Sequence, residues 1–153
     1  MTETIEFTSG STELLDRISP LWEKIKAHHV RKSLHFSEEM NSKSFTARKK
    51  DLILKAKYLR VDIAIDSITK KDVGYCISTI DSNNRGEIDS LFIEEPFRKQ
   101  GIGKKLTEMA LTWLKSNNAT DSSIFVAFGN EEVLDFYKSF GFYPRGIYLA
   151  QKP

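Results

Sequence analysis

Residues 87–106, which read EIDSLFIEEPFRKQGIGKKL, restrict the fold of this chain more than any other stretch. The stretch opens with alternating apolar residues, a pattern typical of a strand, and the pattern breaks at residues 94–96. Two closely spaced glycines follow, and after them apolar residues recur at helical spacing. These residues are Ile102, Leu106, Met109, Ala110, Trp113 and Leu114. The sequence therefore predicts a strand that leads through a glycine-containing turn directly into a helix.

A turn of this kind predicts an anion site. The first N–H groups of a helix have no intrahelical partner and lie at the positive end of the helix dipole, where phosphate groups bind. Two common phosphate motifs do not fit it. A P-loop requires a glycine where this chain has Arg98, and Ser or Thr where it has Lys105. The dinucleotide-binding fingerprint requires a third glycine where the chain has Leu106.

Residues 98–103 instead read Arg-x-x-Gly-x-Gly. On a strand-to-helix turn, this pattern resembles the pyrophosphate loop of the GNAT superfamily of acetyl-CoA-dependent N-acetyltransferases. A second segment, residues 130–142, reads NEEVLDFYKSFGF and resembles the other signature of that family. That signature is an Asn followed by a helix that ends in Phe-Tyr-x-x-x-Gly-Phe. The two motifs occur in the expected order and spacing, and the resemblance covers about residues 59–149.

The rest of the chain predicts a mixture of strands and helices. Strands are expected at residues 4–8, 59–66, 73–80, 87–93, 123–128 and 143–149. Helices are expected from Glu13, from Ser19 as N-cap, at 45–56, from Ile102 to Asn117, and at 131–140. Residues 32–44 are expected to form a loop with one helical turn at 37–40. The side chains of helix 45–56 that are expected to face the core are Phe45, Leu52, Ile53 and Ala56.

The predicted fold class is α/β, of the α+β type. Strand–helix–strand over residues 87–128 places those two strands parallel by a right-handed crossover, whereas the short turns before residue 87 make the earlier strands antiparallel. A mixed, mostly antiparallel sheet between two helical layers follows, a three-layer α-β-α sandwich. The resemblance implies the same fold for a single GNAT domain over residues 1–153, with a central pair of parallel strands that splay apart around acetyl-CoA.

Composition argues against several other classes of protein. The 153 residues suit one domain with its own core, and a formal net charge of only +2 argues against nucleic-acid binding. Residues 1–10 do not read as a signal peptide, and no apolar run reaches the length of a membrane span. The single cysteine, Cys76, excludes an internal disulfide. We expect a cytoplasmic monomer or homodimer that binds neither nucleic acid nor membrane.

The resemblance implies acetyl-CoA as the cosubstrate and no metal. The amides of residues 99–104 would hold the pyrophosphate, and glycine at 101 and 103 would allow its close approach. The strand at residues 91–93 would pair its backbone with the pantetheine arm, and one N–H there would donate to the oxyanion. The candidate cofactor-binding residues are Leu91, Phe92, Ile93, Arg98, Lys99, Gln100, Gly101, Ile102, Gly103, Lys104, Asn130, Phe136 and Tyr137.

The candidate catalytic residues are Tyr137, Glu87 and Asp89. Tyr137 lies where the family has a tyrosine near the cofactor sulfur, and a phenol pKa of about 10 suits a departing thiolate; the alternative is a core tyrosine. Glu87 and Asp89 lie two apart on one strand and so share a face, and Glu87 aligns with the glutamate base of the histone-acetylating branch. The alternatives are a water chain as the base and a merely exposed acidic face. Asn130 either caps the following helix or contacts the pantetheine arm.

The three histidines do not predict a metal site. His28 and His29 are adjacent and would point apart on a helix, and no carboxylates stand at ligand spacing beside them. The resemblance places this N-terminal region on the acceptor side of the cleft. One of His28, His29 and His35 is therefore a candidate contact for the acceptor.

These observations together predict an N-acetyltransferase in which a primary amine attacks acetyl-CoA directly in a ternary complex. Cys76 lies away from both motifs, so no covalent acetyl-enzyme is expected. The alternative is a non-catalytic acyl-CoA-binding module, which would need neither Tyr137 nor an acidic strand. A nucleic-acid binder using the basic residues within 48–57 is disfavoured by the low net charge. The sequence leaves the acceptor open, as a small-molecule amine or a protein amine.

Overall fold

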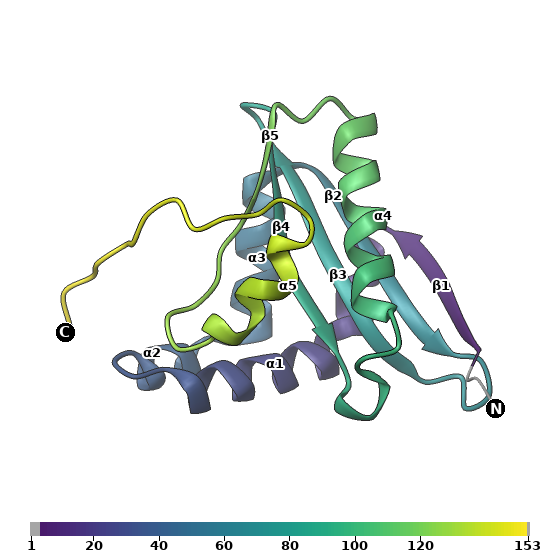
Figure 1. Ribbon diagram of the computed structural model, residues 1–153, viewed down its shortest axis with the longest axis horizontal. Helices are drawn as coiled ribbons and strands as arrows, with labels where there is room; N and C mark the ends of the chain where they lie inside the picture. The colour runs from purple at the N-terminus through teal and green to yellow at the C-terminus, as the bar shows by residue number, and fades with distance from the viewer. Residues whose placement is uncertain (1–3, 153) are drawn as a thin grey trace.

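The computed structural model describes residues 4–152, which form one five-stranded sheet in the order β1-β2-β3-β4-β5 (Figure 1). The strands are β1 (Ile5–Gly10), β2 (Ala56–Asp66), β3 (Asp72–Asp81), β4 (Arg85–Ile93) and β5 (Asp121–Ile124). Strands β1 to β4 are antiparallel neighbours, and β5 lies parallel to β4. The predicted mixed, mostly antiparallel sheet is confirmed.

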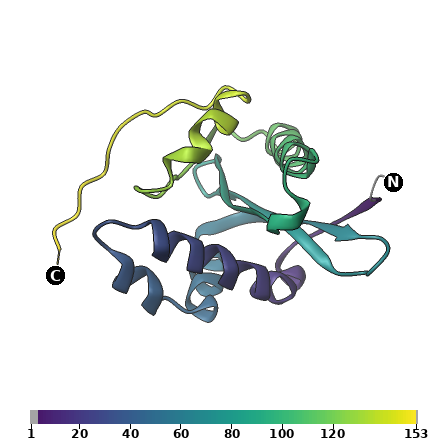
Figure 2. The same ribbon diagram turned by 60° about the horizontal axis from the view of Figure 1, so that its bottom comes forward.

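Helices cover both faces of the sheet and give the predicted three layers (Figure 2). The helices α1 (Ser19–Lys32), α2 (Ser37–Ser42) and α3 (Phe45–Lys55) lie on one face. The helices α4 (Ile102–Ser116) and α5 (Leu134–Lys138) lie on the other. Short 3-10 turns are found at Thr12–Leu14, Asp16–Ile18, Glu95–Phe97 and Glu131–Val133.

Alternation of side chains along the strands divides the core into two clusters, one on each face of the sheet. The cluster under α1 and α3 includes Trp22, Phe45, Leu52, Val61, Ile63, Tyr75, Ile77 and Phe92. The cluster under α4 includes Ala64, Cys76, Ile80, Ile88, Ile102, Leu106, Ala110 and Leu114. Strand β4 contributes side chains to both clusters, so its position is fixed from both sides.

Strand β4 contains a bulge that changes which side chains face which layer. Opposite β3, Ser90 pairs with Ile77 and Ile88 pairs with Ser78, which leaves Asp89 as the extra residue. Asp89 and Ser90 therefore both point toward the α1 and α3 layer, where the Ser90 hydroxyl lies 2.7 Å from the Tyr75 hydroxyl. After the bulge, Phe92 faces that same layer.

Four predictions for the N-terminal half are corrected. Ser19 is the first residue of α1 and Ile18 occupies the N-cap position. The predicted inward residue Ile53 is 44% exposed, because its neighbour Leu52 points at the sheet and one residue rotates a helix by about 100°. The predicted loop at 32–44 contains the six-residue helix α2, and β2 begins at Ala56, directly after α3.

The predicted elements of the C-terminal part are shorter than expected. Strand β5 ends at Ile124 instead of continuing to residue 128, and the helix predicted at 131–140 is a 3-10 turn followed by α5. Residues 143–149, predicted as a strand, form none, and their large apolar side chains are exposed. A strand needs a partner edge, and β5 is too short to offer one there. The parallel pair consequently lies at the end of the sheet instead of its centre.

Candidate active site

The parallel strands β4 and β5 pair only over their first residues. Pairing runs from Arg85 opposite Asp121 to Ile88 opposite Ile124, and β5 then ends while β4 continues to Ile93. Figure 1 shows the chain after β5 leaving the sheet at this point. The second half of β4 is therefore left without a strand on that side in the part of the chain that the structure describes.

The free edge of β4 exposes specific backbone groups. The N–H of Glu94 donates to the Val73 carbonyl at 2.8 Å, and Glu94 continues the antiparallel register in which Ile93 stands opposite Gly74. In such a ladder, alternate residues direct both backbone groups to the same side. The N–H and C=O groups of Leu91 and Ile93 thus point away from β3, to the edge that β5 does not reach. Their side chains lie partly buried against the α4 cluster.

The glycine turn after β4 is located where the sequence predicts it. It follows the 3-10 turn Glu95–Phe97, and Gly101 has φ +85°, a left-handed conformation that glycine adopts without strain. Helix α4 begins at Ile102, and the first backbone N–H of the helix with a partner is that of Lys105, which donates to Gly101 at 3.0 Å. Within residues 4–152, the amides of residues 99–104 have no hydrogen-bond acceptor.

The side chains of this loop lie in different places. Arg98 donates from Nε to the Ile93 carbonyl at 2.8 Å, and its guanidinium lies 5.5 Å from the centre of the Phe92 ring. Lys99, Gln100 and Lys104 are exposed, whereas the side chain of Ile102, the first residue of α4, is buried in the core, so it can offer a ligand only its unpaired N–H. Arg98 therefore connects the loop to the free edge of β4.

Helix α5 packs onto the first turn of α4 through Phe136. A Cβ placed at Gly103 would lie 3.5 Å from the Phe136 ring, and that ring contacts Phe140 and Tyr137 edge to face at 5.3 and 5.2 Å. A Cβ at Gly103 would make only ordinary van der Waals contact with α5, so the α5 packing alone does not require the glycine that the sequence predicts for close approach of a ligand. The contacts of Phe136 hold the loop and the Tyr137 helix next to each other.

Tyr137 lies in an apolar setting. Burial raises the pKa of its phenol, and the Cys76 thiol nearby raises it further. Burial likewise raises the pKa of Cys76 to about 12, so that thiol remains protonated and is a poor nucleophile. No residue within 4–152 hydrogen-bonds to the Tyr137 hydroxyl. The phenol is consequently protonated at neutral pH and available to a ligand.

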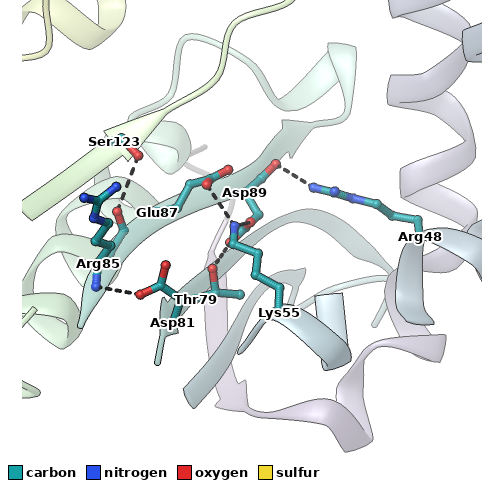
Figure 3. A network of polar contacts seen from close by, with 9 residues as sticks. Arg48, Lys55, Thr79, Asp81, Arg85, Glu87, Asp89 and Ser123 are labelled. Atoms are coloured by element: carbon teal, nitrogen blue, oxygen red, sulfur yellow. Dashed lines mark hydrogen bonds and ion pairs between the residues drawn. The ribbon is translucent and has the colours of Figure 1, made fainter. Parts of the chain in front are cut away.

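Glu87 and Asp89 share one face, as predicted, and both contact Lys55 at the end of α3 (Figure 3). Lys55 Nζ lies 2.8 Å from Glu87 Oε1 and 2.5 Å from Asp89 Oδ1. Asp89 also accepts a hydrogen bond from Thr79 Oγ1 at 2.6 Å, and its carbonyl accepts one from Arg48 at 3.2 Å. The Asp89 side chain is 1% exposed and that of Glu87 is 30% exposed.

The charges of this cluster perturb one another. Burial raises the pKa of Asp89 even though the hydrogen bonds from Lys55 and Thr79 act in the opposite direction. For Lys55, burial lowers the pKa, but the hydrogen bonds to Asp89 and Glu87 outweigh burial and raise the pKa overall. Lys55 is therefore an ammonium at every pH where the protein would work.

Asn130 is largely buried and does not use its side chain as a helix cap. It occupies the N-cap position of the turn Glu131–Val133, yet its Oδ1 lies 3.1 Å from Nε2 of His28 on α1. The same His28 nitrogen lies 3.5 Å from Glu132 Oε1. The two partners are 102 residues apart, so no local sequence signal predicts the contact. Near it, His35 stacks on Phe128 with ring centroids 6.1 Å apart.

A model of the Acetyltransferase (GNAT) family matches residues 25–142, well over half of the chain and including β4, the glycine turn and α5. The chain belongs to the GNAT acetyltransferase family. This membership confirms the predicted enzyme class, with acetyl-CoA as the acetyl donor.

Individual relatives agree with this assignment. The chain is 32% identical over 66 residues to an uncharacterized N-acetyltransferase of Methanocaldococcus jannaschii, a match that spans 43% of the chain and only 29% of that relative. A putative acetyl transferase from Pyrococcus furiosus has the same fold, with a TM-score of 0.75, 19% identity and coverage of 97% of this chain and all of the other.

Two aminoglycoside acetyltransferases also share the fold of this GNAT protein. One is the aminoglycoside N-acetyltransferase AAC(6')-Iy in complex with CoA, with a TM-score of 0.70, 15% identity and coverage of 100% and 98% of the two chains. The other comes from an uncultured soil metagenomic sample and is in complex with sisomicin, with a TM-score of 0.68, 16% identity and coverage of 97% and 96%. These similarities confirm the predicted fold class.

No helix within residues 4–152 is both long and apolar enough to cross a bilayer. Likewise, in that part of the chain, no three His, Cys, Asp or Glu side chains gather in a way that could hold a metal ion.

Proposed function

We propose that this GNAT protein transfers the acetyl group of acetyl-CoA to a primary amine by direct attack in a ternary complex. One observation carries the proposal. The outward-pointing backbone groups of Leu91 and the N–H of Ile93 are followed within a few residues by the unpaired amides of residues 99–104. A pantetheine arm could pair with the first set while a diphosphate accepts from the second. The groups for the pantetheine arm and the groups for the diphosphate are thus adjacent, as the two parts are in CoA.

The loop also supplies charge for the diphosphate. Lys99 and Lys104 are exposed at the start of α4, and the helix dipole adds to their field. Arg98 contacts β4 through Nε alone, which leaves its other guanidinium nitrogens for a phosphate oxygen. We assign these residues to cofactor binding, together with Gln100, whose backbone N–H is among the unpaired amides.

In the proposed reaction, the neutral amine attacks the thioester carbonyl carbon and a C–N bond forms. A backbone N–H of the free β4 edge donates to the oxyanion that develops. The C–S bond then breaks, the amine proton passes to Glu87 directly or through water, and the phenol of Tyr137 donates to the departing sulfur. The products are the acetylated amine and CoA.

Between the two carboxylates, Glu87 suits the role of base better than Asp89. Both carboxylate oxygens of Asp89 are engaged, one by Lys55 and one by Thr79, and its side chain is almost fully buried. Glu87 bonds Lys55 through Oε1 only and is partly exposed. A proton acceptor must be accessible to the substrate, and Glu87 is the more accessible of the two carboxylates.

For the acceptor, we propose a small polyamine-like molecule carrying several primary amines. Two enzymes of the same fold support this proposal, since one is in complex with sisomicin and the other with a bisubstrate analog that contains acetylneamine. Glu87 is partly exposed and bonds Lys55 through one oxygen only, so its carboxylate would favour a cationic acceptor. Protein amines are the second class to test.

Calorimetric titration with CoA tests the cofactor site. Gly103→Glu should abolish binding, because the new carboxylate would repel the diphosphate and displace it from the amides. Gly146→Glu is the matched control, since nothing lies within 4 Å of a Cβ at that position. Unchanged affinity in a folded Gly103→Glu protein would remove the loop from the proposal. A screen of amines for thiol release would then identify the acceptor.

A further inference from the structure

Lys55 belongs to the helical layer, and its side chain reaches between the carboxylates of Glu87 and Asp89 on β4. It is the last residue of α3, and its ammonium bridges Glu87 at 2.8 Å and Asp89 at 2.5 Å (Figure 3). The side chain is about one-third exposed, so the bridge is at the boundary between the core and solvent. An ammonium donates along three directions, and two of them are used here.

Asp89 is the fixed end of this bridge. The β4 bulge directs its side chain beneath α3, Thr79 donates to its second oxygen at 2.6 Å, and Arg48 donates to its carbonyl. A nearly buried carboxylate with both oxygens bonded has no other rotamer available without losing a bond. The position of Asp89 therefore fixes that of the Lys55 ammonium.

Glu87 is the movable end. It is the more exposed of the two carboxylates, and a glutamate side chain has three rotatable bonds that cost entropy to fix. The other charged groups around the pair are Arg48 from α3, Asp81 from β3 and Arg85 from β4, whereas β5 brings only the neutral Ser123 opposite Glu87. Among the contacts within residues 4–152, the Glu87 carboxylate is bonded by Lys55 alone.

We propose that Lys55 is a positioning residue for Glu87, held in place by Asp89 and Thr79. Through Lys55, the buried end of the cluster sets the direction of the Glu87 carboxylate, and the ammonium lies between the two carboxylates. The inference rests on the proposed function, since it takes Glu87 as the base that receives the proton of the acceptor amine.

Replacement of Lys55 by Met removes the ammonium and keeps the length of the side chain. Two carboxylates then face each other without a cation, so one of them holds a proton up to a higher pH. Glu87 also loses its only bonded orientation. We expect kcat to fall about 10- to 100-fold, since misplacement of a catalytic group by about 1 Å has effects of this size.

The decisive measurement is the pH profile of kcat/KM for the amine. In Lys55→Met the acid limb should move to higher pH by about one unit, with the CoA affinity from calorimetry unchanged. Lys55→Arg should restore most of the wild-type profile. Lys49→Met is the matched control, because Lys49 also lies on α3 and pairs with a carboxylate, Asp16 at 2.9 Å, away from β4.

Several outcomes would overturn the proposal. An acid limb that does not move in Lys55→Met would overturn it. A lower KM for the amine at unchanged kcat would also overturn it, because this result would mean that Lys55 competes with the acceptor for Glu87. If Lys55→Met fails to fold, Lys55→Gln serves the same test, because it also removes the ammonium and leaves both carboxylates in place, while its amide can still donate to Asp89. Glu87→Gln distinguishes failure of the proposed function from failure of this inference. A wild-type pH profile in Glu87→Gln would show that Glu87 is not the base. A shifted acid limb in Glu87→Gln, together with a wild-type profile in Lys55→Met, would reject only the positioning role of Lys55.

Discussion

Nε2 of His28 lies 3.1 Å from Oδ1 of Asn130, and this contact joins α1 to the segment that carries Tyr137. Glu132 reinforces it by contacting both His28 and Lys32, at 3.5 and 3.3 Å. The two layers of helices on opposite faces of the sheet are thus connected beyond the free edge of β4. The contact between His28 and Asn130 therefore holds in place both α1, on the proposed acceptor side, and the segment of Tyr137, the proposed acid for the leaving group.

Loss of this support should affect both stability and cofactor binding. In His28→Ala, Asn130 would stay buried without its partner, which should lower the free energy of unfolding by about 1 to 2 kcal/mol. The affinity for CoA should fall as well, because the segment after β5 loses its anchor. Urea unfolding and calorimetry measure the two effects. Arg31→Ala, an exposed change on the same helix turn, is the control, and equal effects of both variants would contradict the proposal.

Gly129 approaches α1 more closely than any side chain would allow. A Cβ there would lie 2.1 Å from the Lys32 carbonyl oxygen, and the residue has φ +105°. Gly129→Ala should therefore destabilise the protein by about 2 to 4 kcal/mol, through overpacking combined with backbone strain. Gly146→Ala has open space around it and should leave the urea midpoint unchanged. A Gly129→Ala protein as stable as that control would show that the loop does not lie against α1.

Asp81 at the β3–β4 turn should make stability depend on pH in acid. Its Oδ1 accepts from the amides of Arg85 and Asn83 at 3.0 and 2.9 Å, and these bonds lower its pKa below 3.8. A depressed carboxyl pKa contributes stability that is present above the unfolded value and lost as pH falls through the folded value. Asp81→Asn should thus be less stable than wild type at pH 7, with a difference that shrinks below pH 3.8. Urea midpoints at both pH values measure it, and a difference independent of pH would be the contrary result.

The sequence predicted the middle of the fold well because local signals and tertiary structure agree there. Residues 87–106 carry alternation, a turn and helical spacing in succession, and β4, the glycine turn and α4 follow that order. The predicted shared face of Glu87 and Asp89 is confirmed, and the bulge adds Ser90 to that face, which simple alternation does not predict. Two-residue spacing cannot reveal a bulge, since the extra residue depends on the partner strand.

The prediction was poorest where an element depends on a distant partner. Residues 143–149 have the composition of a strand, yet no edge receives them, and β5 stops at Ile124. The contacts of His28 with Asn130 and of Lys55 with Glu87 join residues that are 102 and 32 positions apart. Charge and polarity mark such residues as candidates, but only the fold determines which of them meet.

Tyr137→Phe should separate the chemical step from cofactor binding. The change removes only the hydroxyl, so the packing of the ring against Phe136 and Phe142 should persist and CoA affinity should be unchanged. Turnover should fall about 100-fold if the phenol donates to the departing sulfur. Because burial raises the pKa of Tyr137 above its ordinary value of 10.0, the phenol keeps its proton through the range of an activity assay, and loss of that proton should not create an alkaline limb below pH 10. Tyr143→Phe, at an exposed tyrosine just beyond α5, is the matched control. Steady-state kinetics across pH would remove Tyr137 from the mechanism if both variants turned over at the wild-type rate.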